Sequence, residues 1–220
     1  MTDSLLVLCA ANVCRSPLME YVLTEPGSGA VAEKQWSTTS RGTEATRSRH
    51  LCPTVTDLVS GTDYGRSFAE EHRPRLVDPD TLDGFDLIVT ASRAERAIVA
   101  RLHPELRSRT FTAKEAVRLG RSPLTEVDLH RAAAVAPGKA GLSLYAATLN
   151  ERRGMVSFGE ARGSLVPWRK PADPLDIPDV HDGTRRVHLR TLKDAEQVAH
   201  ELRTQLVRFL RGPGVALRRH

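Results

Sequence analysis

The sequence has 220 residues, a formal net charge of +5 and three cysteines. A chain of this length buries one sizeable core, so we expect one domain over residues 1–220 and not two of equal size. The positive excess is too small and too evenly spread to indicate nucleic-acid binding, although it suits an anionic substrate. Three cysteines in so long a chain argue against a disulfide scaffold and indicate a reducing compartment.

The sequence has neither the pattern of a signal peptide at its N-terminal stretch nor an apolar run long enough to span a membrane. The apolar run from Leu5 to Ala11 has no basic segment before it, and nowhere do about 18 apolar residues follow one another. We therefore expect a cytoplasmic protein without a membrane partner, and the sequence leaves its oligomeric state open.

The first half of the chain alternates strand patterns with helical patterns. After the first strand, Ser16 and Pro17 are typical of a helix cap and a first helical position. Ser92 and Glu95 form a capping-box pattern for another helix, which Pro104 closes. The buried-strand patterns that precede and separate these helices lie at Leu5–Cys9, Gln35–Ser40, Asp86–Thr90 and Arg109–Thr112.

Residues 121–172 depart from this alternation. They contain two short helical patterns, at about Thr125–Ala134 and Ser143–Arg152, and then a stretch rich in Gly and Arg. We interpret this region as a partly mobile insertion within the single domain. From Thr191 onward apolar residues recur at helical spacing as far as Gly212, which predicts a long amphipathic helix. A basic tail follows at about 212–220.

Strands that alternate with helices form a parallel sheet covered on both faces, so we predict a doubly wound α/β fold. In such folds ligands bind beyond the carboxyl ends of the strands. The segment from Cys9 to Arg15 follows the first strand and lies at this edge.

The segment CAANVCRSP, residues 9–17, has the residue types of a phosphate site. If the chain curls between Cys9 and Arg15, its backbone N–H groups converge on an anion, and the following helix adds the positive end of its dipole. The fork of Arg15 can bind two phosphate oxygens at once. Such surroundings stabilise a thiolate, which makes Cys9 a candidate nucleophile.

Two further residues of this segment can support the nucleophile. Ser16 can donate its hydroxyl to the thiolate, and Asn12 tolerates a left-handed backbone while its amide ties the loop. A single cysteine at a strand end is more often an inert buried residue. The combination of these residue types in one strand-loop-helix context favours the functional interpretation.

This segment resembles the N-terminal loop of the low-molecular-weight protein tyrosine phosphatases, C-x-x-N-x-C-R-S-P. The resemblance covers residues 4–120 and 173–211 and leaves 121–172 unmatched. It implies a four-stranded parallel sheet flanked by helices, of the flavodoxin-like three-layer type. Further similar stretches are Thr39–Thr43, His72–Arg75, Phe85–Thr90, Phe111–Glu115 and Asp176–Asp179.

The resemblance implies a cysteine-dependent phosphatase that hydrolyses phosphotyrosine-type phosphomonoesters through a phosphocysteine. Its substrate would be a phosphorylated protein or a small aryl phosphate. Cys9 would be the nucleophile, Arg15 the phosphate clamp and Asp179 the general acid. The substrate-binding positions implied are Ala10, Ala11, Asn12, Val13, Cys14, Ser16, Ser40, His72 and His181.

An aspartate can protonate the leaving oxygen and later take a proton from the attacking water. Asp173, followed by Pro174, is a competing candidate for this acid. Backbone amides and Arg15 already neutralise the transferring phosphoryl group, so we expect no cofactor and no metal. One group of residues near the C-terminus could in principle bind a metal, but it lacks the regular spacing of metal ligands. The group consists of Asp176, Asp179, His181, Asp182 and His188.

Several alternatives remain open at this level. His181 stands where the family usually has Tyr or Phe in the acid loop, and either Phe158 and Trp168 complete an aromatic wall or they pack the insertion. Cys14 either forms a protective disulfide with Cys9 or packs in the core. Cys52 has no expected catalytic part. A phosphate-binding domain without turnover is one alternative function; an arsenate reductase that uses an external thiol is another.

Overall fold

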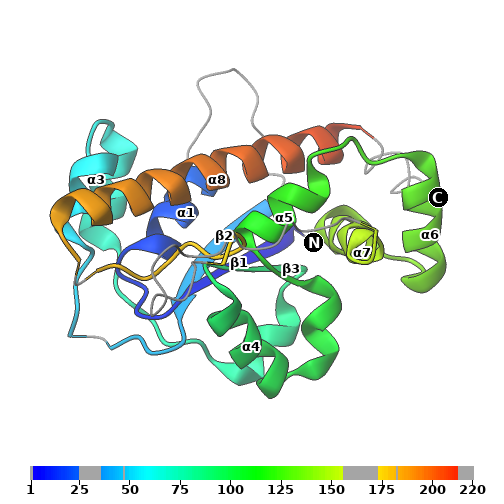
Figure 1. Ribbon diagram of the computed structural model, residues 1–220, viewed down its shortest axis with the longest axis horizontal. Coiled ribbons are helices and arrows are strands. Elements are labelled where there is room, and N and C mark those ends of the chain that lie inside the picture. The colour runs from blue at the N-terminus through cyan, green and yellow to red at the C-terminus, as the bar shows by residue number, and fades with distance from the viewer. Residues whose placement is uncertain (1, 25–35, 47, 156–172, 182, 213–220) are drawn as a thin grey trace, which may run out of the picture.

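The computed structural model describes residues 2–24, 36–46, 48–155, 173–181 and 183–212 (Figure 1). Its strands are β1 (Asp3–Cys9), β2 (Trp36–Gly42), β3 (Leu87–Thr90) and β4 (Thr110–Thr112). Its α-helices are α1 (Arg15–Thr24), α2 (Pro53–Val59), α3 (Asp63–Glu71), α4 (Arg93–Leu102), α5 (Ala113–Gly120), α6 (Glu126–Val135), α7 (Gly141–Arg152) and α8 (Arg185–Arg211). The 3₁₀ helices are η1 (Pro79–Gly84) and η2 (Pro104–Arg109). Within the described ranges, no helix combines the length and the apolar character that crossing a membrane requires.

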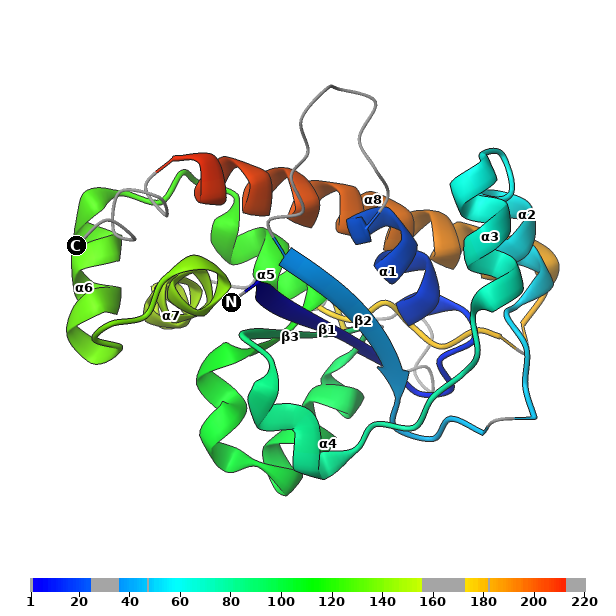
Figure 2. The same ribbon diagram turned by 180° about the vertical axis from the view of Figure 1, so that it is seen from behind.

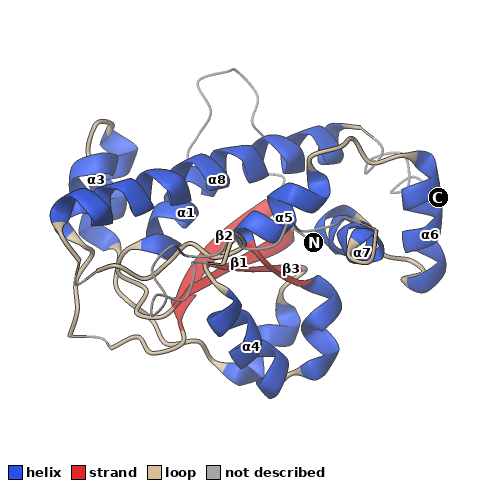
Figure 3. Ribbon diagram, viewed as in Figure 1, coloured by secondary structure: helices blue, strands red, loops and turns tan. Residues whose placement is uncertain are grey.

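The strands form a four-stranded parallel sheet in the order β2-β1-β3-β4. They lie in a middle layer between helices (Figure 3), which confirms the predicted fold. All four residues of β3 and the last five of β1 are buried, because helices cover both faces of these central strands.

The two faces of the sheet carry cores of different size. Helices α1, α5, α7 and α8 cover one face, and α4 with the 3₁₀ helices covers the other (Figures 1 and 2). Alternate residues of β1 point to opposite faces. Leu5 and Val7 belong to the large core beneath α8, whereas Leu6 and Leu8 belong to a smaller core with Val99 of α4.

The described part of the predicted insertion packs into the large core. Leu144, Tyr145 and Leu149 of α7 are buried in the same cluster as the residues of β1. The Tyr145 ring contacts Phe209 of α8 edge to face, with 5.1 Å between ring centroids. The organisation as one domain over residues 1–220 stays a prediction. Phe158, Trp168, the predicted Gly- and Arg-rich stretch and most of the basic tail lie outside the described residues.

Several predicted boundaries are confirmed and two are wrong. The Ser92–Glu95 capping box is present, and α4 ends at Leu102, before Pro104. Helix α1 begins at Arg15, so Ser16 lies inside the helix and not at its cap, and its hydroxyl contacts Cys9 and Asn12.

Helix α8 begins at Arg185, well before the predicted Thr191. Of its residues before Thr191 only His188 is buried, so this part of the helix has no apolar periodicity to detect. The Thr184 hydroxyl caps it by accepting from the Val187 N–H, at 3.4 Å.

Candidate active site

The loop between β1 and α1 is fixed by one asparagine. Asn12 has a φ of +56° and is the only non-glycine residue with positive φ among the described residues. Its Nδ2 donates to Ser40 Oγ at 2.7 Å and to Ser16 Oγ at 3.0 Å, and its Oδ1 accepts from the Arg75 N–H at 2.9 Å. The predicted left-handed tie of the loop is therefore present.

Cys9 ends β1 with its sulfur among hydrogen-bonding groups. Its Sγ lies 2.9 Å from Ser16 Oγ and accepts from the Asn12 N–H at 3.3 Å. The side chain is buried, so these two groups are its local polar environment. Hydrogen bonds of this kind stabilise a thiolate and keep its position fixed.

A neighbouring segment after β2 supports the loop from outside. The Thr43 N–H donates to the Cys9 carbonyl at 3.0 Å, and the Glu44 N–H donates to the Ala10 carbonyl at 2.8 Å. A Cβ on Gly42 would lie 2.4 Å from that Ala10 oxygen. Glycine at this position therefore permits the close approach of the two segments.

Two of the predicted substrate-binding residues are loop supports in the structure. His72 Nε2 donates to the Asn12 carbonyl at 2.9 Å, and burial lowers the pKa of His72, which favours the neutral ring. The Ser40 hydroxyl donates to the Glu20 carboxylate at 2.5 Å while it accepts from Asn12. Both side chains lie behind the loop.

Arg15 connects this loop to the predicted acid. Its Nη1 donates to the Ile177 carbonyl at 3.0 Å, and its Nη2 pairs with the Asp179 carboxylate. Glu95 lies 3.7 Å from the same guanidinium, a contact that sequence reasoning did not anticipate. The Arg15 side chain is only 5% exposed, whereas that of Asp179 is 53% exposed.

The competing acid, Asp173, has a different partner. Its carboxylate pairs with Arg93 at the start of α4, and Asp176 accepts from the Arg93 N–H at 2.8 Å. Both Asp173 and Asp179 line a cavity of about 310 Å³ together with Ala10 and Arg15. None of the described residues that line this cavity is aromatic.

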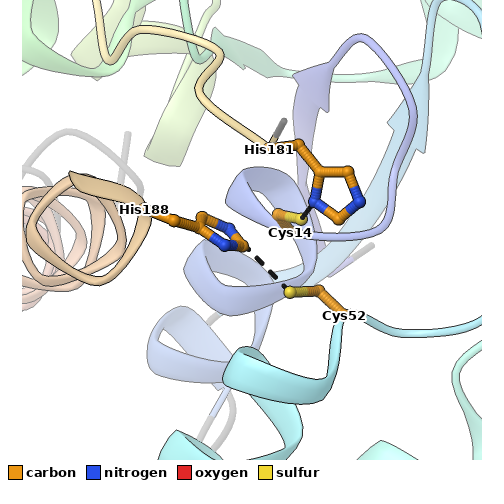
Figure 4. A group of neighbouring side chains, drawn as sticks. All are labelled: Cys14, Cys52, His181 and His188. Atoms are coloured by element: carbon orange, nitrogen blue, oxygen red, sulfur yellow. Dashed lines mark hydrogen bonds between the residues drawn. The ribbon is translucent and has the colours of Figure 1, made fainter. Parts of the chain in front are cut away.

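Four further predicted site residues are not among the described residues that line this cavity; they are Ala11, Val13, Cys14 and His181. The Val13 carbonyl accepts from the Cys52 N–H at 2.9 Å. His181 Nδ1 lies 3.1 Å from Cys14 Sγ (Figure 4). Ala11 is half-buried and packs against the large core.

Cys14 interacts with Cys52, and all three cysteines of the chain are free thiols in the structure. A hydrogen bond to Cys52 and burial raise the pKa of Cys14. The same hydrogen bond lowers the pKa of Cys52 to about 5, since the Cys52 thiolate is the acceptor. Sequence reasoning gave Cys52 no role, because nothing near Pro53 points to residues so distant in the chain.

Comparisons with known proteins agree with this geometry. Residues 4–128 match the family model of the low molecular weight phosphotyrosine protein phosphatases. Over 111 residues the chain is 28% identical to the low molecular weight protein-tyrosine-phosphatase Wzb of Salmonella typhi. The aligned residues cover 50% of this chain and 68% of that protein.

Solved structures show the same fold. The tyrosine phosphatase Wzb of Escherichia coli K30, in complex with sulphate, aligns with a TM-score of 0.55 and 16% identity, over 94% of this chain and 99% of the other. The arginine phosphatase YwlE of Geobacillus stearothermophilus aligns with a TM-score of 0.57 and 15% identity, over 96% and 97%. With a family model matched over more than half of its length, the chain belongs to the low molecular weight phosphotyrosine protein phosphatase family and is a phosphatase of that family.

Proposed function

We propose that the chain hydrolyses phosphotyrosine-type phosphomonoesters through a phosphocysteine on Cys9, with Arg15 as phosphate clamp and Asp179 as general acid. The observation that carries the proposal is the contact of the buried Arg15 guanidinium with the Asp179 carboxylate. It brings the loop that would hold the phosphate and the group that would protonate the leaving oxygen to one place.

The contact between Arg15 and Asp179 also supports a position for the phosphate. The Asp179 carboxylate is an anion that occupies part of the Arg15 fork, so its position is a guide to where phosphoryl oxygens would lie. A bound phosphate takes over this donor and leaves Asp179, which is half exposed, beside the ester oxygen. The dianion is then held by Arg15 and the N–H groups of the loop.

The reaction has two steps that both use the same carboxyl group. The Cys9 thiolate forms a bond to phosphorus while the bond to the ester oxygen breaks, and protonated Asp179 gives its proton to that oxygen. Water then attacks the phosphocysteine and loses a proton to the Asp179 carboxylate. The P–S bond breaks, inorganic phosphate leaves, and the Cys9 thiolate is restored with Ser16 and the Asn12 N–H beside it.

The preference for an aryl phosphate rests on a residue of the loop. Val13 resembles the β-branched isoleucine of tyrosine-specific members and differs from the threonine of members that act on phosphoarginine. The cavity supplies no aromatic side chain among the described residues that line it. A peptide bearing phosphotyrosine would therefore be recognised chiefly through its phosphate.

The test compares the purified chain with Cys9→Ser on p-nitrophenyl phosphate. We expect the wild type to turn over and to form one acid-stable phosphoryl adduct at Cys9 on rapid quenching, and the variant to lose turnover by at least about 10⁴-fold. Turnover by Cys9→Ser at the wild-type rate would refute the assignment of the nucleophile. Phosphate binding without turnover by the wild type would instead favour a binding domain.

A second experiment separates the substrate classes. Peptides that carry phosphotyrosine, phosphoserine or phosphoarginine at one position are compared by kcat/KM. We expect the phosphotyrosine peptide to be the best substrate. A preference for phosphoarginine would contradict the aryl-phosphate assignment without affecting the role of Cys9.

A further inference from the structure

Four side chains from distant parts of the sequence meet beside the phosphate loop. Cys14 precedes α1, Cys52 is the N-cap of α2, His181 follows Asp179, and His188 lies in the first turns of α8. Figure 4 shows their polar ends pointing toward one another. One ligand atom from each, two sulfurs and two imidazole nitrogens, lies within 4.8 Å of all the others.

The spacing of these atoms is close to that of a tetrahedral metal site. Bond lengths of about 2.3 Å to sulfur and about 2.0 to 2.1 Å to nitrogen place the ligand atoms of a tetrahedral zinc ion about 3.3 to 3.8 Å apart. Cys14 Sγ lies 3.1 Å from His181 Nδ1, and Cys52 Sγ lies 3.8 Å from His188 Nε2. The two imidazole rings are nearly perpendicular, at 84°, with centroids 5.4 Å apart. Since no two of the four atoms are more than 4.8 Å apart, a shift of about 1 Å is enough to bring the widest pair to tetrahedral spacing.

The chemistry of the four groups also suits a metal better than a disulfide. Two thiolates and two neutral imidazoles balance the charge of a divalent zinc ion, and a neutral centre is compatible with a buried position. Cys14, Cys52 and His188 are buried, and only His181 is exposed. A disulfide between the two cysteines would use neither histidine.

We propose that Cys14, Cys52, His181 and His188 form a tetrahedral site for Zn²⁺. All four positions are taken by protein ligands, so the ion is structural and does not act on substrate. It joins four parts of the chain: the phosphate loop (residues 9–15), the start of α2, residues 173–181, which we call the acid segment, and α8. Because His181 lies two residues beyond Asp179, the ion anchors the segment that carries the proposed acid.

The experiment measures metal bound to the full-length chain. The protein is reduced, incubated with Zn²⁺, separated from free metal and analysed for zinc by mass spectrometry. We expect about one zinc ion per chain. Co²⁺ in place of Zn²⁺ should give the strong visible absorption of a tetrahedral site with thiolate ligands. Less than a tenth of one ion per chain, or an octahedral cobalt spectrum, would overturn the proposal.

Matched variants test the ligands. Cys52→Ser, His188→Gln and His181→Gln should each weaken Zn²⁺ binding by at least about 100-fold, since even partners of ligands change affinity by about 10- to 100-fold. His181 is exposed, so His181→Gln tests the site even if a buried variant fails to fold. Equal zinc affinity in His181→Gln and the wild type would overturn the assignment.

Two controls use residues of the same types outside the cluster. Cys9→Ser removes another buried thiol, and His200→Gln removes an exposed imidazole from α8. Both should keep full zinc binding. Under the proposed function Cys9→Ser does not turn over substrate, yet it keeps all four proposed zinc ligands, so it tests the two proposals separately. Loss of zinc binding in this variant would count against the site. A Cys14–Cys52 disulfide in freshly purified protein would do so as well.

Discussion

The two regions that form the candidate active site are held in different ways. In residues 9–15, the side chains of Cys9, Asn12 and Arg15 are buried, and each has hydrogen-bond partners from its own loop or from adjoining segments. In residues 173–181, Asp179 is half exposed and its carboxylate pairs with Arg15. The Ile177 N–H adds one backbone bond to Ala91, at 2.9 Å.

The difference concerns what happens when substrate binds. Under the proposed function, the side-chain contacts of Asn12 that hold the loop are preserved when phosphate binds, because phosphate is held by Arg15 and by backbone N–H groups. Under the proposed function, the contact of Asp179 with Arg15 would compete with phosphate for the same guanidinium. Phosphate binding would then free Asp179 when the leaving oxygen needs a proton, and the remaining contacts of residues 173–181 would hold it in place.

The largest effect is expected for Arg15, which belongs to the loop and contacts the segment that carries Asp179. Arg15→Lys keeps the charge but loses the fork that reaches Ile177 and Asp179 and that would, under the proposed function, hold phosphate. We expect kcat/KM for p-nitrophenyl phosphate to fall by about 10³-fold, as for loss of a strong transition-state donor. A loss below about tenfold would show that phosphate is bound mainly by backbone N–H groups.

The next effect separates the two carboxylates of the cavity. Asp179→Asn should slow phenyl phosphate, which has a poor leaving group, by about 10²-fold, because general acid catalysis is worth about 10²- to 10⁴-fold. An ester with a good leaving group should be slowed much less. The measurement is kcat over a series of phenols of graded acidity.

The matched control for this change is Asp173→Asn, since Asp173 lines the same cavity but pairs with Arg93. We expect little change in the dependence on leaving group. If Asp173→Asn steepens it and Asp179→Asn does not, the acid is Asp173 and the contact with Arg15 only stabilises the substrate-free state.

The loop could be predicted from the sequence far better than the acid segment. Cys9, Asn12, Arg15 and Ser16 lie within eight consecutive residues, and their spacing alone fixes which atoms can meet around an anion. Even so, the helix start was misplaced, because the Ser16 hydroxyl contacts the sulfur and does not cap the helix. The alternation of strand and helix patterns predicts the parallel sheet, and the family resemblance implies its four strands.

The contacts of the acid segment depend on tertiary structure. The pairs Arg15–Asp179, Cys14–His181 and Cys52–His188 each bring together residues more than 100 positions apart in the chain. No local pattern marks such partners. Residues considered singly therefore indicate the two histidines as possible metal ligands but not the two cysteines, and they do not indicate a site that all four share.

The free energy of unfolding should depend strongly on the side-chain amide of Asn12. Asn12→Ala removes the amide that accepts from the Arg75 N–H and donates to the buried Ser40 hydroxyl, and it puts alanine at a φ of +56°. We expect a loss of about 2 to 4 kcal/mol in the free energy of unfolding, measured by urea denaturation. Asn12→Gly relieves the backbone and should recover about 1 kcal/mol. Equal losses would show that the backbone there is unstrained.

Zinc should act on stability through the acid segment and α8. A ligand at 100 times its dissociation constant stabilises the folded state by about 2.7 kcal/mol, which corresponds to a rise of roughly 5 to 10 °C in Tm for a chain of this size. The rise should be absent in His181→Gln and present in Cys9→Ser. An equal rise in both variants would place the stabilising ion outside the cluster.

The smallest expected effect concerns His72, which supports the loop by donating to the Asn12 carbonyl. Burial lowers the pKa of His72 in the folded state, so below its ordinary pKa of about 6.5 the unfolded chain takes up a proton that the folded chain does not. The contribution of His72 to stability is therefore complete above pH 6.5 and decreases as the pH falls through the window beneath it. His72→Gln keeps an N–H donor for Asn12 but cannot titrate, so its free energy of unfolding should fall less between pH 7.5 and 5.5. If the free energies of unfolding of the two proteins fall in parallel with pH, His72 is protonated as readily in the folded chain as in the unfolded chain. His72 would then not be a neutral residue that supports the loop.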